Sequence, residues 1–98
     1  DRLLKPHFHS DFDVVTVPEQ GWAGMSDGEL LRRADARFDV FVTMDQNLPY
    51  QQNLAAFDLA VVVLKAPSNA FPEVVELMPS VNKEIRRAKA GRATVVAA

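Results

Sequence analysis

Hydrophobic and polar positions alternate in blocks along the chain, and the apolar blocks predict four strands. Residues 39–44 and 59–64 are apolar almost throughout, as expected for parallel strands that are covered on both faces. Residues 13–17 (DVVTV) are β-branched and stop at Pro18, which also predicts a strand. Residues 93–96 (ATVV) predict a last short strand.

Residues 26–38 carry both the start signal and the period of a helix. Ser26 is a natural N-cap, and Glu29 follows three residues later, which predicts a capping box. The apolar residues that follow recur at helical spacing and form one buried face, namely Leu30, Leu31, Ala34 and Phe38.

Residues 72–90 predict a longer helix, with a break at Pro79. Its last turns are basic, which suits the helix dipole, and Gly91 is expected to end it in the C′ position. A short helical turn is expected after Pro49, within the polar connection 45–53.

The elements therefore alternate as strand, helix, strand, short helix, strand, long helix and strand. This order predicts an α/β fold in which a parallel sheet of about four strands has helices on both faces. In such sheets the functional site lies at the carboxyl ends of the strands.

Composition narrows the class of protein. The 98 residues fit a single domain, and no apolar run approaches the roughly 18 residues that a membrane span needs, so we expect no membrane partner. The absence of cysteine excludes thiolate chemistry and fits a cytoplasmic location. A net charge of −2 disfavours a broad cationic surface for nucleic acid but leaves a local patch open.

Polar residues gather where two of the strands are expected to end. Asp45 follows the strand 39–44 directly, with Thr43 just before it and Asn47 just after it. Asp27 and Glu29 begin the helix 26–38. Carboxylates from separate loops repel each other at one sheet edge, so the pattern indicates a hard divalent cation with oxygen ligands. Mg²⁺ or Mn²⁺ held in this way activates water and stabilises phosphate oxygens.

Each of these residues also has a purely structural explanation. Glu29 completes the capping box, Asp27 favours the helix dipole, and Asp45 caps the turn after its strand. Thr43 suits a strand through its β-propensity.

Other candidate residues lie outside this group. Lys65, Ser68 and Asn69 follow the strand 59–64. The histidines His7 and His9 lie two apart without a nearby third ligand, so we expect them at the surface. Trp22 is expected to cover the sheet edge as an apolar plug, and either Trp22 or Tyr50 could stack on a base.

The chain resembles a family of short, mostly bacterial PIN-like proteins. The resemblance rests on residues 21–31 (GWAGMSDGELL), 40–45 (VFVTMD) and 47–54 (NLPYQQNL), extended by 60–69 (AVVVLKAPSN). It implies a three-layer PIN-like domain over residues 1–98, similar to the toxin nuclease of toxin–antitoxin pairs. Such domains bind Mg²⁺ or Mn²⁺ and cleave RNA with metal-activated water, so RNA and an antitoxin-type protein are the implied partners.

The resemblance also implies roles for individual residues. Asp27 and Asp45 match the family's catalytic and metal-binding acids, and Glu29 is a weaker match for a metal ligand. Asn47 is implied as a helper at the substrate, to which we add Thr43 and Lys65 as candidate substrate-binding residues.

One family feature is absent from these 98 residues. Relatives begin with a central strand that ends in an acidic pair, Asp-Glu-x-Leu-Pro, and its Asp is a metal ligand. Without this strand we expect exposed apolar edges and a gap in the core. Either upstream residues fill that gap, or a partner chain does so by strand addition or swapping. The second alternative favours a homo-oligomer.

Two other classes of function stay open. The incomplete metal shell fits a non-catalytic interaction or regulatory module. MDQNLP also loosely resembles the phosphoacceptor loop of a receiver domain, but only 13 residues separate Asp45 from Leu59, which leaves little room for a crossover helix.

Overall fold

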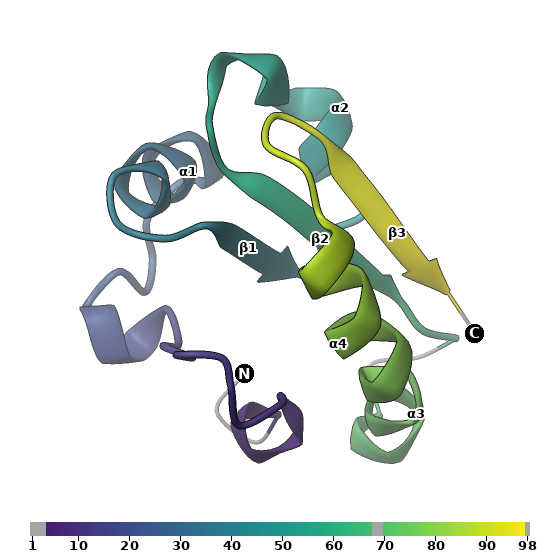
Figure 1. Ribbon diagram of the computed structural model, residues 1–98. Helices are drawn as coiled ribbons and strands as arrows, with labels where there is room; N and C mark the ends of the chain where they lie inside the picture. The colour runs from purple at the N-terminus through teal and green to yellow at the C-terminus, as the bar shows by residue number, and fades with distance from the viewer. Residues whose placement is uncertain (1–3, 68–69, 98) are drawn as a thin grey trace.

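Three parallel strands form one sheet in the computed structural model, which describes residues 4–67 and 70–97. The strands are β1 (Val40–Thr43), β2 (Ala60–Lys65) and β3 (Ala93–Ala97), in the spatial order β1-β2-β3 (Figure 1). The α/β class and the parallel sheet are therefore confirmed.

Four α-helices and three single 3-10 turns lie around the described part of this sheet. Helix α1 begins directly after Ser26, whose side chain accepts a hydrogen bond from the Glu29 backbone, as the sequence predicted. The bounds of the helical elements are α1 Asp27–Asp35, α2 Leu48–Gln51, α3 Phe71–Glu76, α4 Met78–Arg87, η1 Lys5–His7, η2 Pro18–Gln20 and η3 Leu54–Ala56.

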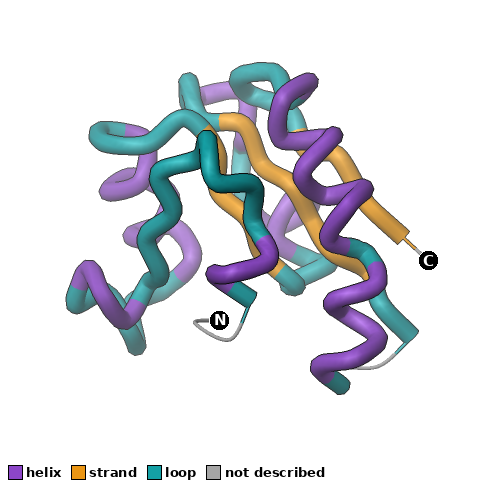
Figure 2. Tube along the Cα trace, turned by 60° about the horizontal axis from the view of Figure 1, so that its bottom comes forward, coloured by secondary structure: helices purple, strands orange, loops and turns teal. Residues whose placement is uncertain are grey.

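The core consists of two apolar clusters that share the central strand β2. Successive residues of β2 enter the two clusters alternately, because side chains of a strand point to opposite faces. We call the first cluster the α4-side core; it contains Leu4, Val62, Leu64, Val74, Leu77, Met78, Val81 and Val96. The second, the α1-side core, contains Trp22, Leu31, Ala34, Leu48, Leu54, Leu59, Val61 and Val63. Figure 2 shows the strands side by side, with α3 and α4 running along the sheet.

The predicted strand at residues 13–17 is wrong. Residues 13–16 have no regular secondary structure, and Val17 already has helical backbone angles before η2. Val14 and Val15 make no backbone hydrogen bond to any residue of the described ranges. This segment lies on the β1 side of the molecule (Figure 1), yet no strand adjoins it. A β-branched sequence becomes a strand only where a neighbour completes its ladder, so the described sheet has three strands rather than about four.

The predicted long helix 72–90 is two helices. Helix α3 ends at Glu76, and α4 begins at Met78, one residue before the predicted break at Pro79. Pro79 lacks a backbone N–H, so it is tolerated in the first turn of α4 but not in a helix interior.

Gly91 is not the C′ residue of this helix, because α4 already ends at Arg87. Gly91 instead turns the chain into β3 with a φ of 72°, and its N–H donates to the Leu59 carbonyl at 3.0 Å. The glycine signal was correct for a left-handed turn, but it was assigned to the wrong element.

No helix within residues 4–67 and 70–97 is long and apolar enough to cross a membrane.

Candidate functional site

Asp45 lies in the turn that follows β1, and its own neighbours fix its geometry. Its backbone N–H donates to the Thr43 hydroxyl at 3.0 Å, and its carboxylate accepts a hydrogen bond from the Asn47 N–H at 2.9 Å. This Asx-type turn gives Asp45 the structural role that the sequence allowed, and it leaves the rest of the carboxylate open to further partners.

Asp27 is the first residue of α1, and its carboxyl group meets that of Asp45. Burial raises the pKa of Asp27, and a hydrogen bond with Asp45 and the negative charge of Asp45 raise it further. Two acids that lie 18 positions apart in the sequence (45 minus 27) are thus brought together. The structure therefore juxtaposes the two residues on which the sequence hypothesis depended.

Glu29 does not join this pair. Its carboxylate binds two arginines of its own helix, Arg32 and, at 2.7 Å, Arg33. These hydrogen bonds, first from Arg33 and then from Arg32, lower the pKa of Glu29. Only half of the predicted capping box is therefore present, because the Ser26 side chain caps the helix while the Glu29 side chain is engaged along it.

Lys65 ends β2 on the same side as Asp45. Thr43 of β1 is paired with Val63 of β2 in the sheet. Asp45 follows Thr43 by two residues and Lys65 follows Val63 by two residues, so both lie at the same end of the sheet. Lys65 is exposed, as is Asn47. The candidate residues Ser68 and Asn69 lie outside the described residues.

Gln52 is a neighbour of the site that the sequence did not single out. Its side-chain oxygen lies 3.5 Å from the point where a Cβ on Gly28 would sit, so it packs against the first turn of α1 beside Asp27. Nothing in the polar run after Asp45 distinguished Gln52 from Gln51, because the contact depends on how α2 packs.

The aromatic candidates have opposite environments. Trp22 is 8% exposed and meets the Phe38 ring edge-on at a centroid distance of 6.1 Å, which confirms its role as an apolar plug. Tyr50 on α2 is 89% exposed and is free to stack on a ligand. His7 and His9 are exposed, as expected.

A cavity of about 760 Å³ extends along β1 and reaches Asp27 of the acidic pair. Asp27 and Thr43 line it, together with β1 on one wall and the segment from Val14 to Val17 on the other. The carboxyl group of Asp27 therefore borders both the turn of Asp45 and this cavity.

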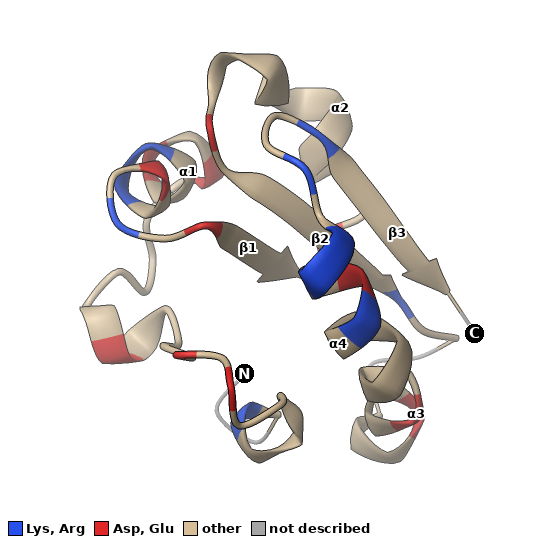
Figure 3. Cartoon of the chain, viewed as in Figure 1, with Lys and Arg blue, Asp and Glu red and all other residues tan. Residues whose placement is uncertain are grey.

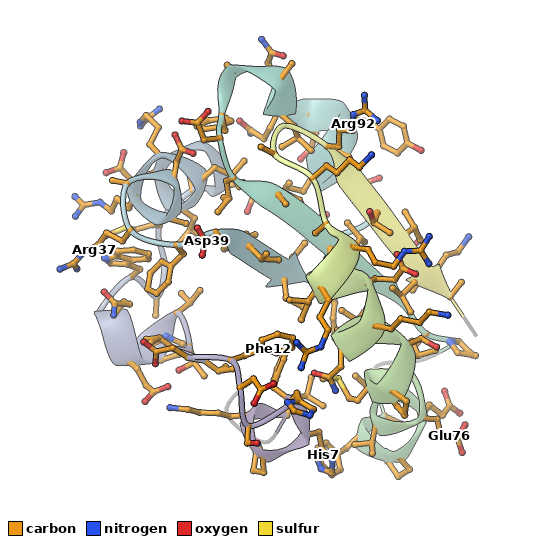
Figure 4. All side chains as sticks on the ribbon, in the orientation of Figure 1. His7, Phe12, Arg37, Asp39, Glu76 and Arg92 are labelled. Carbon is orange, nitrogen blue, oxygen red and sulfur yellow. The ribbon has the colours of Figure 1, made fainter. Side chains whose placement is uncertain are left out.

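Basic side chains gather on α1 and on the last turns of α4 (Figure 3). Part of this charge is already engaged, since Arg86 donates to Asp11 at 3.0 Å and lies over the Phe12 ring at 4.9 Å. Figure 4 shows Phe12 between the N-terminal segment and α4. The basic end of α4 thus holds the N-terminal segment in place.

The acidic pair suits Mg²⁺ or Mn²⁺ better than a cation that needs many protein ligands. No group of three or more His, Asp or Glu side chains in the described parts of the chain could hold a metal ion. Mg²⁺, however, keeps several waters and is commonly bound by one or two carboxylates together with substrate phosphates. When both Asp27 and Asp45 are ionised they repel each other, and such an ion would relieve this repulsion.

Comparisons with protein-family models, curated proteins and solved structures found no match for this chain.

Proposed function

We propose that this chain is the metal-binding part of a PIN-like ribonuclease, in a three-layer arrangement, that hydrolyses RNA with Mg²⁺ or Mn²⁺. The observation that carries the proposal is the contact between the carboxyl groups of Asp27 and Asp45, which adds to burial in raising the pKa of Asp27. An acid held beside another acid at the end of a parallel strand is costly for the fold, and a divalent cation offsets this cost.

Each residue of the site has a distinct part in the proposed reaction. Asp27 and Asp45 hold the ion, and Thr43 orients Asp45 through the hydrogen bond to its backbone. Lys65 and Asn47 contact the RNA phosphates, and Tyr50 stacks on a base. When bound, the ion supplies an activated water and neutralises the phosphate oxygens.

Metal binding is tested first on the purified chain by titration with Mn²⁺ under calorimetry. We expect binding that Asp27→Asn and Asp45→Asn each abolish. The matched control is Asp39→Asn, which changes an acid at the opposite end of the same strand (Figure 4 labels Asp39) and should leave binding intact. Equal Mn²⁺ affinity in the Asp45→Asn variant would remove Asp45 from the metal site.

RNA cleavage is tested next, by incubating single-stranded RNA with the chain and Mn²⁺. We expect Asp45→Asn to slow cleavage by about 100-fold or more, since a carboxylate ligand is lost, while Asp39→Asn cleaves at the wild-type rate. Cleavage that persists in Asp45→Asn, or in the presence of EDTA, would contradict the proposed mechanism.

A non-catalytic interaction module is the second candidate function. It is favoured by the pairing of only two acids in the described residues and by the open cavity beside β1. Absence of Mn²⁺ binding together with a stable complex with a protein partner, of the antitoxin type or a second copy, would support this function instead.

A receiver domain fits less well. Between β1 and β2 the chain forms only the short helix α2 and the turn η3, so no full crossover helix packs on the sheet there. Incubation with a small phosphodonor should therefore leave the mass of the protein unchanged.

A further inference from the structure

Charge is divided unevenly between the two sides of the molecule. Residues 78–97, which include α4 and β3, contain five basic residues and one acidic residue, a formal charge of +4. The rest of the chain contains six basic and twelve acidic residues, a formal charge of −6. Because α4 packs on β3, the positive charge lies on one side, which we call the α4–β3 surface (Figure 3). The net charge of −2 therefore does not exclude a local cationic surface.

Cations elsewhere in the described structure are largely engaged by carboxylates. Arg32 and Arg33 both bind Glu29, and Lys5 binds Glu19 at 3.0 Å. These charges are compensated within the fold, so they are less available to an external anion.

Three cations of the α4–β3 surface have no such partner. Lys83, Lys89 and Arg92 are exposed, and their side chains make no ion pair or hydrogen bond with any residue of the described ranges. Arg87 reaches Glu84 only at 3.6 Å, and 66% of its side chain is exposed. Like charges that gather without counter-charges repel each other, and a bound anion relieves this repulsion.

Lys65 continues this set of cations to the end of the sheet that holds the acidic pair. It is exposed and unpaired in the described structure, and it is the sheet neighbour of Ala97, the last residue of β3. Arg92, labelled in Figure 4, directly precedes β3 at the other end. The five steps from Arg92 to Ala97 cover about 16 Å at about 3.3 Å each. This length matches about five phosphates of a stacked nucleic-acid strand, at about 3.4 Å each.

The extent of this surface distinguishes between anionic ligands. A single phosphate or carboxylate reaches one or two of these side chains and leaves the others uncompensated. A nucleic-acid strand carries one negative charge at each nucleotide, so it reaches all of them. The strand β3 that lies between them has no charged side chain, so no carboxylate of β3 repels a phosphate there.

We propose that the α4–β3 surface, together with Lys65, binds the phosphate backbone of a single-stranded RNA that extends from the acidic pair along β3 to Arg92. The choice of RNA as the polyanion rests on the proposed function, whereas the cationic surface does not. Contacts of this kind fix the position of the RNA and supply affinity without reading its sequence.

Binding is measured without cleavage, by fluorescence anisotropy of a labelled single-stranded RNA of about 12 nucleotides in EDTA. The double variant Lys89→Gln, Arg92→Gln removes two unpaired cations. The matched control is Arg33→Gln, Arg37→Gln, which removes the same charge from two exposed arginines on the α1 side. We expect the first double variant to weaken binding by about tenfold or more at about 100 mM salt, and the control by less than about twofold.

The salt dependence counts the lost contacts. We expect the slope of log affinity against log salt to fall by about 1.4 in the Lys89→Gln, Arg92→Gln variant, about 0.7 for each phosphate contact. Lys65→Gln should lower the slope by about 0.7. Lys83→Gln, at an exposed position of α4, gives a further test by the same measurement if the double variant fails to fold.

Asp45→Asn separates this inference from the proposed function. This variant should stop cleavage in Mn²⁺ but should not weaken RNA binding in EDTA, because it removes a negative charge. RNA binding at the α4–β3 surface without any Mn²⁺-dependent cleavage by the wild type would contradict the proposed function alone.

Four outcomes would overturn the proposal. The first is the absence of RNA binding in EDTA, and the second is an equal loss of affinity in the two double variants. Tighter binding of a labelled poly-glutamate peptide than of RNA would make an acidic protein segment the partner. Self-association in sedimentation that Lys89→Gln, Arg92→Gln abolishes would make the anionic side of a second copy the occupant.

Discussion

The strands β1 and β2 have similar sequences but very different surroundings. Val62 in β2 is 0% exposed and has a strand on each side, while Val42 at the paired position of β1 is half-buried beside an open cavity. Both runs are apolar almost throughout, which is typical of strands covered on two faces. The difference shows that an apolar run indicates a strand suited to burial on both faces, whereas the actual burial of the strand depends on which neighbouring elements are present.

The largest expected effect is on the free energy of unfolding, when each of these two valines is replaced by alanine. Val62→Ala removes two methyl groups from a filled core and leaves a cavity, so we expect it to lower the free energy of unfolding by about 2–3 kcal/mol. Val42→Ala should cost less than about 1 kcal/mol, since its site is already open. Urea denaturation measures both changes.

The control for this pair is Val95→Ala on β3, where the side chain is 57% exposed and the change should be close to zero. A loss at Val42 equal to that at Val62 would mean that β1 is as well packed as β2, and the contrast between the strands would disappear.

Two glycines with the same backbone conformation extend the comparison beyond the strands. Gly91 has a φ of 72° beside β2 and β3, and a Cβ there would lie 3.4 Å from the Phe57 carbonyl oxygen. Gly21 has a φ of 75° in the outer N-terminal segment, with nothing within 4 Å of its Cβ position. Gly91→Ala should therefore cost about 1–2 kcal/mol, and Gly21→Ala less, by thermal unfolding.

The smaller cost at Gly21 follows from the open space at its Cβ position. At Gly21 only the left-handed backbone conformation is strained, whereas a Cβ at Gly91 also approaches the Phe57 carbonyl oxygen. A cost at Gly21 as large as that at Gly91 would show that this approach adds nothing to the strain of the backbone.

The sequence predicted most of the sheet and the pairing of the acids. The runs that became β1, β2 and β3 each carry a local signal, and the α/β alternation with a parallel sheet follows from their order. Asp45 lies just past the carboxyl end of β1, as predicted, but Asp27 meets it from the first turn of α1, which follows a loop rather than the predicted strand.

The sequence could not predict the features that depend on a missing neighbour or on packing. Residues 13–17 have the composition of a strand, but no ladder partner adjoins them. Glu29 binds Arg32 and Arg33 instead of the helix start. The spacing of three and four residues permits these ion pairs as well as the capping box, so the sequence alone does not decide between them. Gln52 contacts the first turn of α1 through the placement of α2.

A smaller effect is expected at the carboxyl end of β1. The pKa of Asp27 is raised, so the folded state favours its protonated form. The cost of ionising Asp27 is absent below its ordinary pKa of 3.8, and it reduces stability as the pH rises through the higher folded value. Asp45→Asn keeps the acceptor for Asn47 but removes a charge, so at pH 7 without metal we expect a stabilisation of about 0.5 kcal/mol, or about 2–4 °C.

NMR titration of Asp27 measures the cause of this stabilisation, because its pKa should fall toward 3.8 in the Asp45→Asn variant. Asp39→Asn, at the other end of β1, should change neither value. Added Mn²⁺ should then reverse the order of stability, raising the melting temperature of the wild type only. An unchanged Asp27 pKa in Asp45→Asn would mean that burial alone raises it.

The smallest effect concerns the outer segment that faces β1 across the cavity. Glu19 accepts hydrogen bonds from the Thr16 backbone N–H at 2.9 Å and from the Lys5 amine at 3.0 Å. These two contacts, in that order, lower the pKa of Glu19 from 4.5 to about 2. A depressed acid stabilises the structure above its ordinary pKa, and this contribution is lost as the pH falls from 4.5 to about 2.

The loss should be local, because Glu19 and Lys5 are exposed and tie only the N-terminal segment to η2. On acidification we expect the Thr16 amide to shift with a midpoint near pH 2, while the amides of β2 stay unchanged. Lys5→Met should raise this midpoint but keep it below 4.5, since the stronger bond from the Thr16 backbone remains. If the amides of β2 shift together with that of Thr16, the outer segment and the central strand form one cooperative unit, and the contrast between the two sides of the molecule does not extend to their stability.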